Sequence, residues 1–428
     1  MRLRGLLILL AVFLNLAAAN GVWASAKEKV LYRFQGAKDG SNPSSSLVRD
    51  ASGNLYGTTM QAGEGFSNCN YGCGTVFEVM PLANGHLQTK IIYAFQGGTD
   101  GANPSGNLVL DAAGNLYSTT IWGGTPNRCA DYNTQGCGTV FELSPNADGS
   151  WTEAVLYRFQ GNPDGAQPAG LMVDAAGNLY GTSTGNGYTQ GASVYKLSPP
   201  QQKGGAWTET ILTTFDGVFE VPNPGLALDS HGNLFGTTQV PPWGACSSTC
   251  GGVFELGHVG GNWVETWLYT FSGGGNGSDP MTGVILDGEG NLYGTTHRGG
   301  NNFGVVFELK RTGQQWSLTL LYNFCSANNC ADGAHPLAGL VFDKAGNLNG
   351  TTYDGGTGCY KGYKGCGLVF KLAPTKSRWR ETVIHRFTDN PDGSKPAASL
   401  IFDGDGNIYG TTVSGGDAGV GTVFEITP

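Results

Sequence analysis

The chain has 428 residues, of which 71 are glycine, more than twice the usual share of about 7%. Its net charge is −9 and it contains no basic cluster, which argues against nucleic acid and anionic lipid as partners. Few charges, many glycines and regularly spaced aromatic residues are typical of many short strands joined by tight turns.

The first 26 residues have the features of a secretory signal peptide. Two arginines precede an apolar stretch from Gly5 to Ala19, and Ala24-Ser25-Ala26 provides the small-x-small pattern that a signal peptidase cleaves. An uncleaved membrane anchor is the alternative, but the apolar stretch is shorter than the ~20 residues that a bilayer requires. We therefore predict a signal peptide over residues 1–26 and a single mature domain over residues 27–428, without membrane insertion after cleavage. The mature protein should be secreted, periplasmic or on the cell surface.

A ten-residue motif, Asp-x-x-Gly-Asn-Leu-Tyr-Gly-Thr-Thr, recurs with small variations through the rest of the chain. Its seven copies begin at intervals of 55 to 63 residues, at Asp50, Asp111, Asp174, Asp229, Asp287, Asp343 and Asp403. The Asp-x-x-Gly-Asn segment predicts a tight turn, in which the aspartate caps backbone amides and Gly or Asn accepts a positive φ. So regular a period indicates a repeat architecture.

Each repeat contains four strand-like segments, as the second repeat illustrates. A short apolar run at residues 108–110 precedes the turn, and Leu-Tyr-Ser-Thr-Thr at residues 116–120 follows it. The third segment contains Val140-Phe141. The fourth contains Trp151 and Phe159, and their even spacing predicts that both rings lie on one face of the strand and pack between neighbouring sheets. A small residue precedes the first segment in six of the seven repeats, as inner strands that crowd a central axis would need.

Seven units of four strands predict an all-β fold, a seven-bladed β-propeller of four-stranded antiparallel blades. An open solenoid is the competing architecture, but it would require atypical capping repeats at both ends. The ends of this chain are complementary instead: a fourth-strand sequence stands at residues 30–34, and a third strand ends near Ile426. We predict that the N-terminal strand completes the seventh sheet and closes the ring.

The repeat unit, GNLYGTT followed by GTVFEL and then LYxF-x-G-x-x-DG, resembles the Gloeo/Verruco (GloVer) repeat of exported bacterial proteins. The resemblance covers essentially the whole mature chain. It implies a propeller fold and a secreted or surface location. It implies no established activity and no catalytic residues.

Ten cysteines fall into five close pairs. An even number in an exported chain predicts disulfides between near neighbours, namely Cys69–Cys73, Cys129–Cys137, Cys246–Cys250, Cys325–Cys330 and Cys359–Cys366. A zinc site is the alternative, but no pair has a histidine or a second pair beside it in the sequence. We expect no cofactor. Ca²⁺ is left open because residues 403–407 (DGDGN) imitate the start of a calcium loop, although Ile408 stands where that loop needs glycine.

The six histidines recur at no repeat position. His297 and Arg298 open the loop after the second strand of the fifth repeat, and Asp332 and His335 lie in the segment that enters the sixth. In a propeller these segments belong to adjacent blades on one face, so the four residues are expected to converge. Asp354, at the position equivalent to Arg298 in the next repeat, is expected to join them. An acid, a base and a cation in one place could perform general acid–base chemistry; the alternative is that they are scattered loop residues.

Five aromatic residues outside the repeat pattern share the loops with the cysteines: Trp122, Tyr132, Trp243, Tyr360 and Tyr363. An exposed ring braced by a disulfide can stack on a sugar or fill a partner's pocket, and it can equally cover a blade edge. We therefore predict non-enzymatic extracellular binding of a glycan or a protein by this face of a monomer. A hydrolase or lyase that acts on an extracellular polymer and a structural envelope component are the alternatives.

Overall fold

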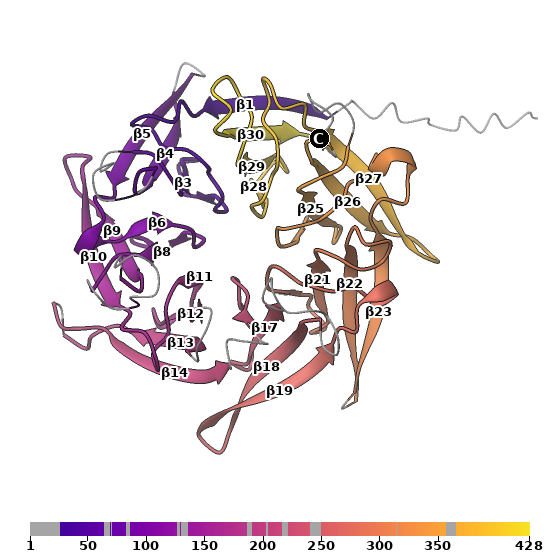
Figure 1. Ribbon diagram of the computed structural model, residues 1–428, viewed down its shortest axis with the longest axis horizontal. Coiled ribbons are helices and arrows are strands. Elements are labelled where there is room, and N and C mark those ends of the chain that lie inside the picture. Colours follow the sequence, from indigo (N-terminus) through magenta and orange to yellow (C-terminus); the bar gives the residue numbers. More distant parts are fainter. Residues whose placement is uncertain are drawn as a thin grey trace, which may run out of the picture.

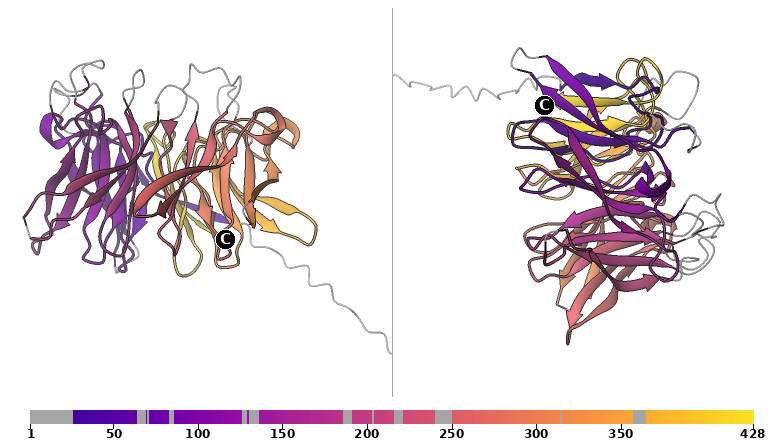
Figure 2. Two further views of the ribbon diagram at one scale, coloured as in Figure 1. Left: turned by 90° about the horizontal axis from the view of Figure 1, so that it is seen from below. Right: turned by 90° about the vertical axis from the view of Figure 1, so that its left-hand side faces the viewer.

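The computed structural model describes residues 26–63, 69, 71–82, 86–125, 129, 136–185, 191–202, 204–215, 221–239, 250–313, 315–356 and 365–428. These residues form seven antiparallel sheets that follow one another around a central axis (Figure 1). In side view the sheets stand upright in a flat ring (Figure 2). The fold is the predicted seven-bladed β-propeller. Of the predicted signal peptide, only Ala26 belongs to the described residues.

Every blade contains four strands in the same order from the axis outwards. The inner strands are short: β2 (Val48–Arg49), β7 (Val109–Leu110), β11 (Pro168–Val173), β16 (Ala227–Leu228), β20 (Ile285–Leu286), β24 (Val341–Phe342) and β28 (Ile401–Phe402). The second strands come from the Leu-Tyr-Gly-Thr-Thr motif: β3 (Leu55–Thr59), β8 (Leu116–Trp122), β12 (Leu179–Thr184), β17 (Leu234–Gln239), β21 (Leu292–Thr296), β25 (Leu348–Thr352) and β29 (Ile408–Thr412). Two further short strands, β6 (Ala102–Pro104) and β15 (Val221–Pro222), pair with the far ends of β8 and β17.

The third and outer strands complete each blade. The third strands are β4 (Thr75–Pro81), β9 (Thr139–Pro145), β13 (Ala192–Ser198), β18 (Gly252–Val259), β22 (Val305–Thr312), β26 (Leu368–Pro374) and β30 (Thr422–Thr427). The outer strands are β5 (Leu87–Ala94), β10 (Trp151–Arg158), β14 (Thr208–Phe215), β19 (Asn262–Thr270), β23 (Gln315–Asn323), β27 (Trp379–Arg386) and β1 (Lys27–Arg33).

The outer strands carry a β-bulge, which corrects the predicted placement of their aromatic residues. In β10 the register shifts between Val155 and Tyr157, and an equivalent shift occurs in each of the other outer strands. Because of the extra residue, side chains before and after the bulge alternate out of step. Trp151 therefore packs edge-on against Tyr56 of the preceding blade, whereas Phe159 packs against Tyr195 of the following blade. The prediction that both rings share one face was wrong, although both rings do pack between blades.

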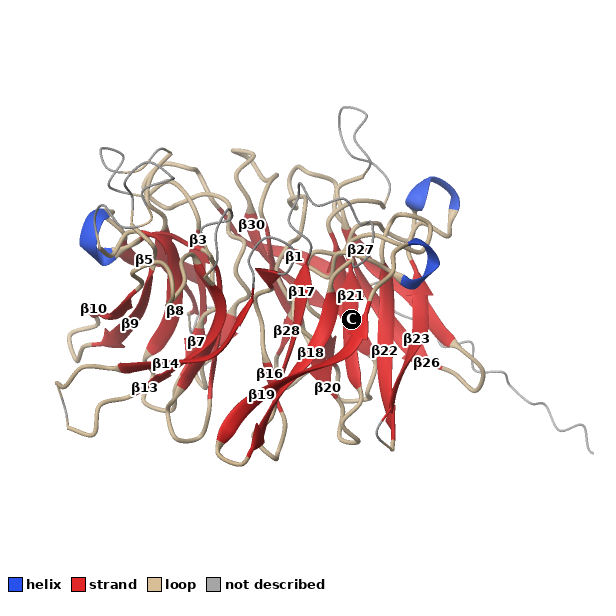
Figure 3. Ribbon diagram, turned by 60° about the horizontal axis from the view of Figure 1, so that its bottom comes forward, coloured by secondary structure: helices blue, strands red, loops and turns tan. Residues whose placement is uncertain are grey.

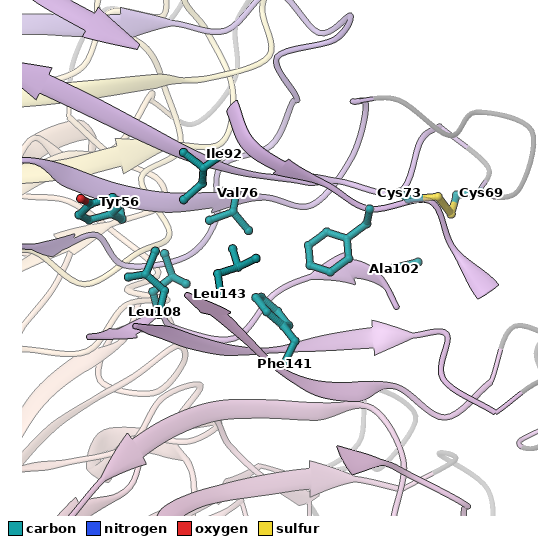
Figure 4. Packing of buried hydrophobic residues seen from close by; sticks show 11 residues of the cluster. Tyr56, Cys69, Cys73, Val76, Ile92, Ala102, Leu108, Phe141 and Leu143 are labelled. Carbon is teal, nitrogen blue, oxygen red and sulfur yellow. A yellow bond between two sulfur atoms is a disulfide. The ribbon is translucent and has the colours of Figure 1, made fainter. Parts of the chain in front are cut away.

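Every blade junction repeats one buried aromatic contact. The ring at the end of an outer strand packs on the ring in the third strand of the next blade, with centroids 5.1 to 5.3 Å apart: Phe34–Phe77, Phe95–Phe141, Phe159–Tyr195, Phe215–Phe254, Phe271–Phe307, Phe324–Phe370 and Phe387–Phe424. Each such pair contributes about 0.5–1.5 kcal/mol beyond the burial of its area. Figure 4 shows the junction of the first two blades, where Phe141 and Leu143 of the second blade share one buried cluster with Val76 and Ile92 of the first.

The inner strands crowd the axis, as the small residues before them predict. A Cβ on Gly283 would lie 1.8 Å from the carbonyl oxygen of Gly225, and a Cβ on Gly170 would lie 2.5 Å from the backbone nitrogen of Gly225. Around the axis these segments enclose a cavity of about 240 Å³ with mostly small lining residues.

The ring closes through the N-terminal strand, which confirms that prediction. β1 pairs antiparallel with β30, from Lys27 opposite Thr427 to Arg33 opposite Thr422 (Figure 1). The last blade is thus built from both ends of the chain.

The connections divide the propeller into two faces. We call the face with the loops between second and third strands the cysteine-loop face, because Cys69, Cys73 and Cys137 lie in these loops. The segments that lead from an outer strand to the next blade reach the same face, and they include the short 3₁₀ helices η1 (Gly98–Asp100), η2 (Gly274–Asn276) and η3 (Asn328–Cys330) (Figure 3). The Asp-x-x-Gly-Asn turns lie on the opposite face.

Candidate functional site

One position on the cysteine-loop face carries a polar side chain on the same unusual backbone in six blades. We call these residues the rim residues: Asn42, Asn103, Gln167, Asp279, His335 and Lys395. Each precedes a proline and has a φ between 53° and 61°. A positive φ is uncommon for a residue with a Cβ, above all for Gln, His and Lys. The shared backbone therefore gives the Cα–Cβ bond of each rim residue the same starting direction.

Neighbouring blades enforce this backbone. The N–H of each rim residue donates to a carbonyl in the loop between the second and third strands of the preceding blade. The six acceptors are the oxygens of Val420, Cys73, Cys137, Cys250, Phe303 and Cys366, at 2.7 to 3.0 Å. Four of the six acceptors are carbonyls of disulfide-bonded cysteines, so the cysteine loops position most of the rim residues.

The rim surrounds the entrance to the central cavity. Five of the rim residues stand two positions before a residue that lines the cavity, the lining residues being Ser44, Ser105, Met281, Leu337 and Ala397. A ligand that reaches the cavity from the cysteine-loop face therefore passes the rim side chains.

A charged cluster occupies the rim at the fifth, sixth and seventh blades. His335 Nδ1 lies 2.8 Å from Asp354 Oδ2, and Lys395 Nζ donates to the other oxygen of the same carboxylate, Oδ1. Lys395 also donates to the carbonyl of Gly365 at 3.0 Å and lies over the Tyr353 ring, 4.9 Å from its centroid. Although burial opposes ionisation of Asp354, the hydrogen bonds from His335 and Lys395 lower its pKa below the usual value.

His297 extends the cluster into the fifth blade. Its ring centroid lies 4.9 Å from that of His335, and the Phe303 ring packs on His335 at 5.4 Å. Burial, together with the nearby His335 and Arg298, lowers the pKa of His297 to about 4, so the ring is neutral at physiological pH. The ring hydrogen-bonds to the backbone of Pro336, while its Nδ1 is buried and has no partner among the described residues.

Arg298 points to another rim residue. Its Nε lies 3.8 Å from Asp279 Oδ2, and its side chain is 65% exposed. Burial raises the pKa of Asp279, and the guanidinium of Arg298 opposes this effect.

The structure brings together three of the five predicted acid–base residues, His297, His335 and Asp354, with Arg298 beside them. Asp332 does not join them. Its carboxylate accepts hydrogen bonds from the Tyr322 hydroxyl at 2.7 Å and from the backbone amides of Ser326 and Ala327. The aspartates of the other Asp-Gly-x-x-Pro turns are used in the same way, as in the bonds of Asp39 to Tyr32 and to the amide of Gln35. Asp332 is therefore a turn residue.

Sequence reasoning missed Lys395, Asp279 and Tyr353. A signal for the first two was present: each stands before the proline that follows an outer strand, as His335 does, and only an alignment of the repeats on that proline reveals the shared position.

The predicted binding aromatics are only partly covered by the structure. Trp122 is half-buried at the end of β8 and packs against the core cluster of the first two blades. Tyr132, Trp243, Tyr360 and Tyr363 lie outside the described residues.

The disulfide predictions hold wherever both partners are described. Cys69–Cys73, Cys129–Cys137 and Cys325–Cys330 are bonded. Cys250 and Cys366 are also disulfide-bonded, while their predicted partners Cys246 and Cys359 lie outside the described residues. Cys69–Cys73 and Cys129–Cys137 each close a short segment of a loop between second and third strands, and Cys325–Cys330 closes one that follows the outer strand β23.

Within the described part of the chain, no group of three or more His, Cys, Asp or Glu side chains is arranged to hold a metal ion. At the calcium-like sequence, the Asp403 carboxylate instead accepts hydrogen bonds from the amides of Asp405 and Asn407, from the Asn407 side chain and from the Tyr409 hydroxyl. No helix within these ranges has the length and apolar character that crossing a membrane requires.

Comparison with known proteins identifies a matching family and structures of similar fold. The model of the Gloeobacter/Verrucomicrobia repeat matches residues 129–363 and 329–428. No curated protein matches the chain.

Two solved structures resemble the propeller at low sequence identity. The first is a putative 6-phosphogluconolactonase from Bacteroides uniformis, 14% identical with a TM-score of 0.50, where the match covers 80% of this chain and 84% of that one. The second is a gluconolactonase from Xanthomonas campestris, 12% identical with a TM-score of 0.41, where the match covers 94% of this chain and 89% of that one. At such identities a likeness concerns the fold alone.

Proposed function

The chain belongs to the Gloeobacter/Verrucomicrobia repeat family, and we propose that it is an exported binding protein that holds a glycan at the rim of its central cavity. The observation that carries the proposal is the rim itself. Six blades present the same backbone, and the side chains on it are two Asn, one Gln, one Asp, one His and one Lys.

The variety of the rim side chains supports a ligand rather than a purely structural role. The main-chain N–H of this position bonds to the preceding blade whichever side chain is present. The side chains differ in their own contacts: the Asn103 amide donates to the Met60 carbonyl, whereas Asp279 faces Arg298. Glycine would adopt the same φ without strain. Polar side chains on a strained backbone are typical of sites where function rather than stability sets the residue.

The chemistry of the rim favours a glycan over a protein partner. Amides, carboxylates, imidazole and ammonium groups offer both donors and acceptors, as sugar hydroxyls require. A protein interface would need a patch of exposed aromatic or aliphatic anchors. The exposed large hydrophobic residues of the described chain are Tyr71, Leu82, Val259, Val264 and Trp267, and none of them belongs to the rim.

The disulfides support an exported location, because such bonds persist in oxidising compartments and are rare in the cytosol. Secretion through the signal peptide at residues 1–26 is part of the proposal.

The proposal predicts a binding phenotype for rim variants. The protein without residues 1–26 should bind a subset of a glycan array, and Asn103→Ala and Asp279→Ala should each weaken binding about tenfold, as expected for a lost hydrogen bond at a rigid site. Asp405→Ala, at an exposed turn on the opposite face, should bind like the wild type. Equal loss in the rim and control variants, or a ligand footprint on the opposite face, would contradict the proposal.

A further inference from the structure

We propose that the rim also catalyses a reaction: His335, oriented by Asp354, is the general base for hydrolysis of a carboxylic ester carried by the bound glycan. This inference rests on the proposed function, because the same rim would hold the substrate. It adds an activity to what would otherwise be a binding site.

The ring of His335 is held in the orientation of a base. Nδ1 bonds to Asp354 Oδ2 at 2.8 Å, and His297 and Phe303 pack against the ring. With the Nδ1 proton directed at the carboxylate, the lone pair of the neutral ring is on Nε2. No hydrogen bond to Nε2 occurs among the described residues, and the side chain remains 13% exposed.

The equivalent positions of the first blade show that the fold needs no charges here. Backbone bridges join Ser41 to Gln61 and Ala334 to Asp354, so Asn42 and Gln61 correspond to His335 and Asp354. In the first blade, the Asn42 amide donates to the Gln61 side chain at 2.8 Å. A neutral amide pair therefore fits the same backbone, whereas a half-buried carboxylate carries a desolvation cost. An imidazole and a carboxylate in place of the two amides are best explained by a catalysed reaction at the sixth blade.

Two neighbours of His335, His297 and Asp354, favour proton transfer to its ring. The neutral His297 places no positive charge beside the imidazolium that forms, and the Asp354 carboxylate stabilises that imidazolium. Lys395 bonds to the second oxygen of the same carboxylate and to the Gly365 carbonyl. Since an ammonium has three protons, one remains available to a substrate.

The reaction balances without a further reactant. Nε2 of His335 takes a proton from water while the water oxygen bonds to the ester carbonyl carbon. The carbonyl oxygen becomes an oxyanion, which the free N–H of Lys395 stabilises. The bond from carbon to the sugar oxygen then breaks, and the imidazolium returns its proton to that oxygen. The products are a carboxylic acid and a sugar hydroxyl.

An ester fits this rim better than a glycosidic bond does. Glycoside hydrolysis ordinarily needs two carboxyl groups that flank the bond, one of them free to protonate the leaving oxygen. The rim carboxylate Asp279 faces Arg298, and the neighbouring Asp354 bonds to His335 and Lys395, so both carboxylates already have partners. A single base with a neighbouring cation suffices for an ester.

The test measures acetate release from chemically acetylated forms of the array glycans, with p-nitrophenyl acetate as a second probe. His335→Gln should lower kcat by about a hundredfold or more with little change in KM. Asp354 is a positioning residue, and Asp354→Asn should lower kcat with little change in KM, because an amide no longer holds the His335 ring with its proton on Nδ1. His231→Gln, which alters an 82% exposed histidine on the opposite face, should leave the rate unchanged.

A double variant separates catalysis from folding. His335→Asn combined with Asp354→Gln recreates the Asn42–Gln61 pair. It should therefore fold, with a melting temperature somewhat below that of the wild type because Lys395 loses its carboxylate partner, and it should still lose hydrolysis. Glycan binding without acetate release above the buffer rate would overturn the catalytic inference and leave the proposed function standing. A wild-type rate in the double variant would also overturn it. Failure to bind any glycan would instead contradict the proposed function.

Discussion

At the scale of single residues, the blade junctions contain buried carboxyl groups that lie close to one another. Glu153, Glu209 and Glu381 on the outer strands β10, β14 and β27 approach Asp100, Asp164 and Asp332, respectively, and one oxygen of each glutamate is buried without a partner among the described residues. Burial, together with the neighbouring aspartate, raises the pKa of each glutamate to about 7. The folded protein therefore favours the protonated form of these three glutamates.

Because these glutamates have raised pKa values, we predict that the free energy of unfolding of the protein falls as the pH rises. A raised pKa contributes stability that is complete below the usual glutamate value of 4.5 and is lost as the pH rises through about 7. At the turns, burial opposes ionisation, but hydrogen bonds lower the pKa of aspartates such as Asp111 and Asp287, so their contribution is lost as the pH falls below the usual 3.8. Melting temperature should thus peak between about pH 4 and pH 6.

Thermal melting from pH 4 to pH 8 checks this prediction. The triple variant Glu153→Gln, Glu209→Gln and Glu381→Gln should show a flatter decline above pH 5, because an amide has no proton to lose in this range. Glu289→Gln, at an exposed turn, serves as the matched control. A triple variant with the pH dependence of the wild type would show that these groups do not control it.

The candidate site could be predicted in part because blade geometry is simple. His297, His335 and Asp354 stand in loops that any propeller brings to one face of adjacent blades, and they do converge. Asp332 lies in the same segment as His335, but its Asp-Gly-x-x-Pro motif recurs in other repeats. A recurring aspartate in a turn more often accepts hydrogen bonds from backbone amides. The contact of Lys395 with Asp354 depends on a positive φ that the sequence before a proline does not predict.

At the scale of elements, the outer strands show where pattern reading fails. The spacing of Trp151 and Phe159 obeys a period of two, yet one bulged residue between them changes which neighbouring blade each ring meets. When neighbouring blades cover both faces of a strand, apolar residues occur on both faces, so the sequence shows no break in alternation at the bulge. The inner strands could be predicted more fully, because the chain before each of them packs so closely around the axis that only a small residue fits there.

The inner strands give a sharp test of that steric demand. Gly283→Ala should destabilise the protein by about 3 kcal/mol, because its Cβ would meet the carbonyl oxygen of Gly225, which is backbone and cannot rotate away. Gly288→Ala, five residues along the same repeat, has no atom within 4 Å of its Cβ. Since neither glycine has a positive φ, Gly288→Ala should be neutral or stabilising by up to about 1 kcal/mol. Equilibrium unfolding in guanidinium measures both, and equal stabilities would refute the crowding.

At the scale of the whole molecule, repetition made the fold predictable. Seven copies of one motif predict seven similar units, and the same aromatic contact closes every junction between them. The ring then needs only a way to join its ends, which complementary terminal sequences indicated. What repetition cannot predict is the rim, because there the repeats share a backbone and differ in their side chains.

Closure by β1 is the feature on which the ring as a whole depends. β1 covers the edge of β30 along its length, and Phe34, which follows β1, packs on Phe77 in the first blade, so this one segment connects the last blade with the first. Deletion of residues 27–36 should expose an unpaired strand edge and remove a buried ring, and we expect aggregation or a large loss of melting temperature. The paired control Lys27→Ala with Lys29→Ala, which changes only exposed side chains of β1, should melt like the wild type. A synthetic peptide of residues 27–36 added in excess should restore part of the lost melting temperature, because it can reoccupy the edge of β30. A deletion variant that stays monomeric in size-exclusion chromatography with light scattering and melts unchanged would show that the ring is held without its closing strand.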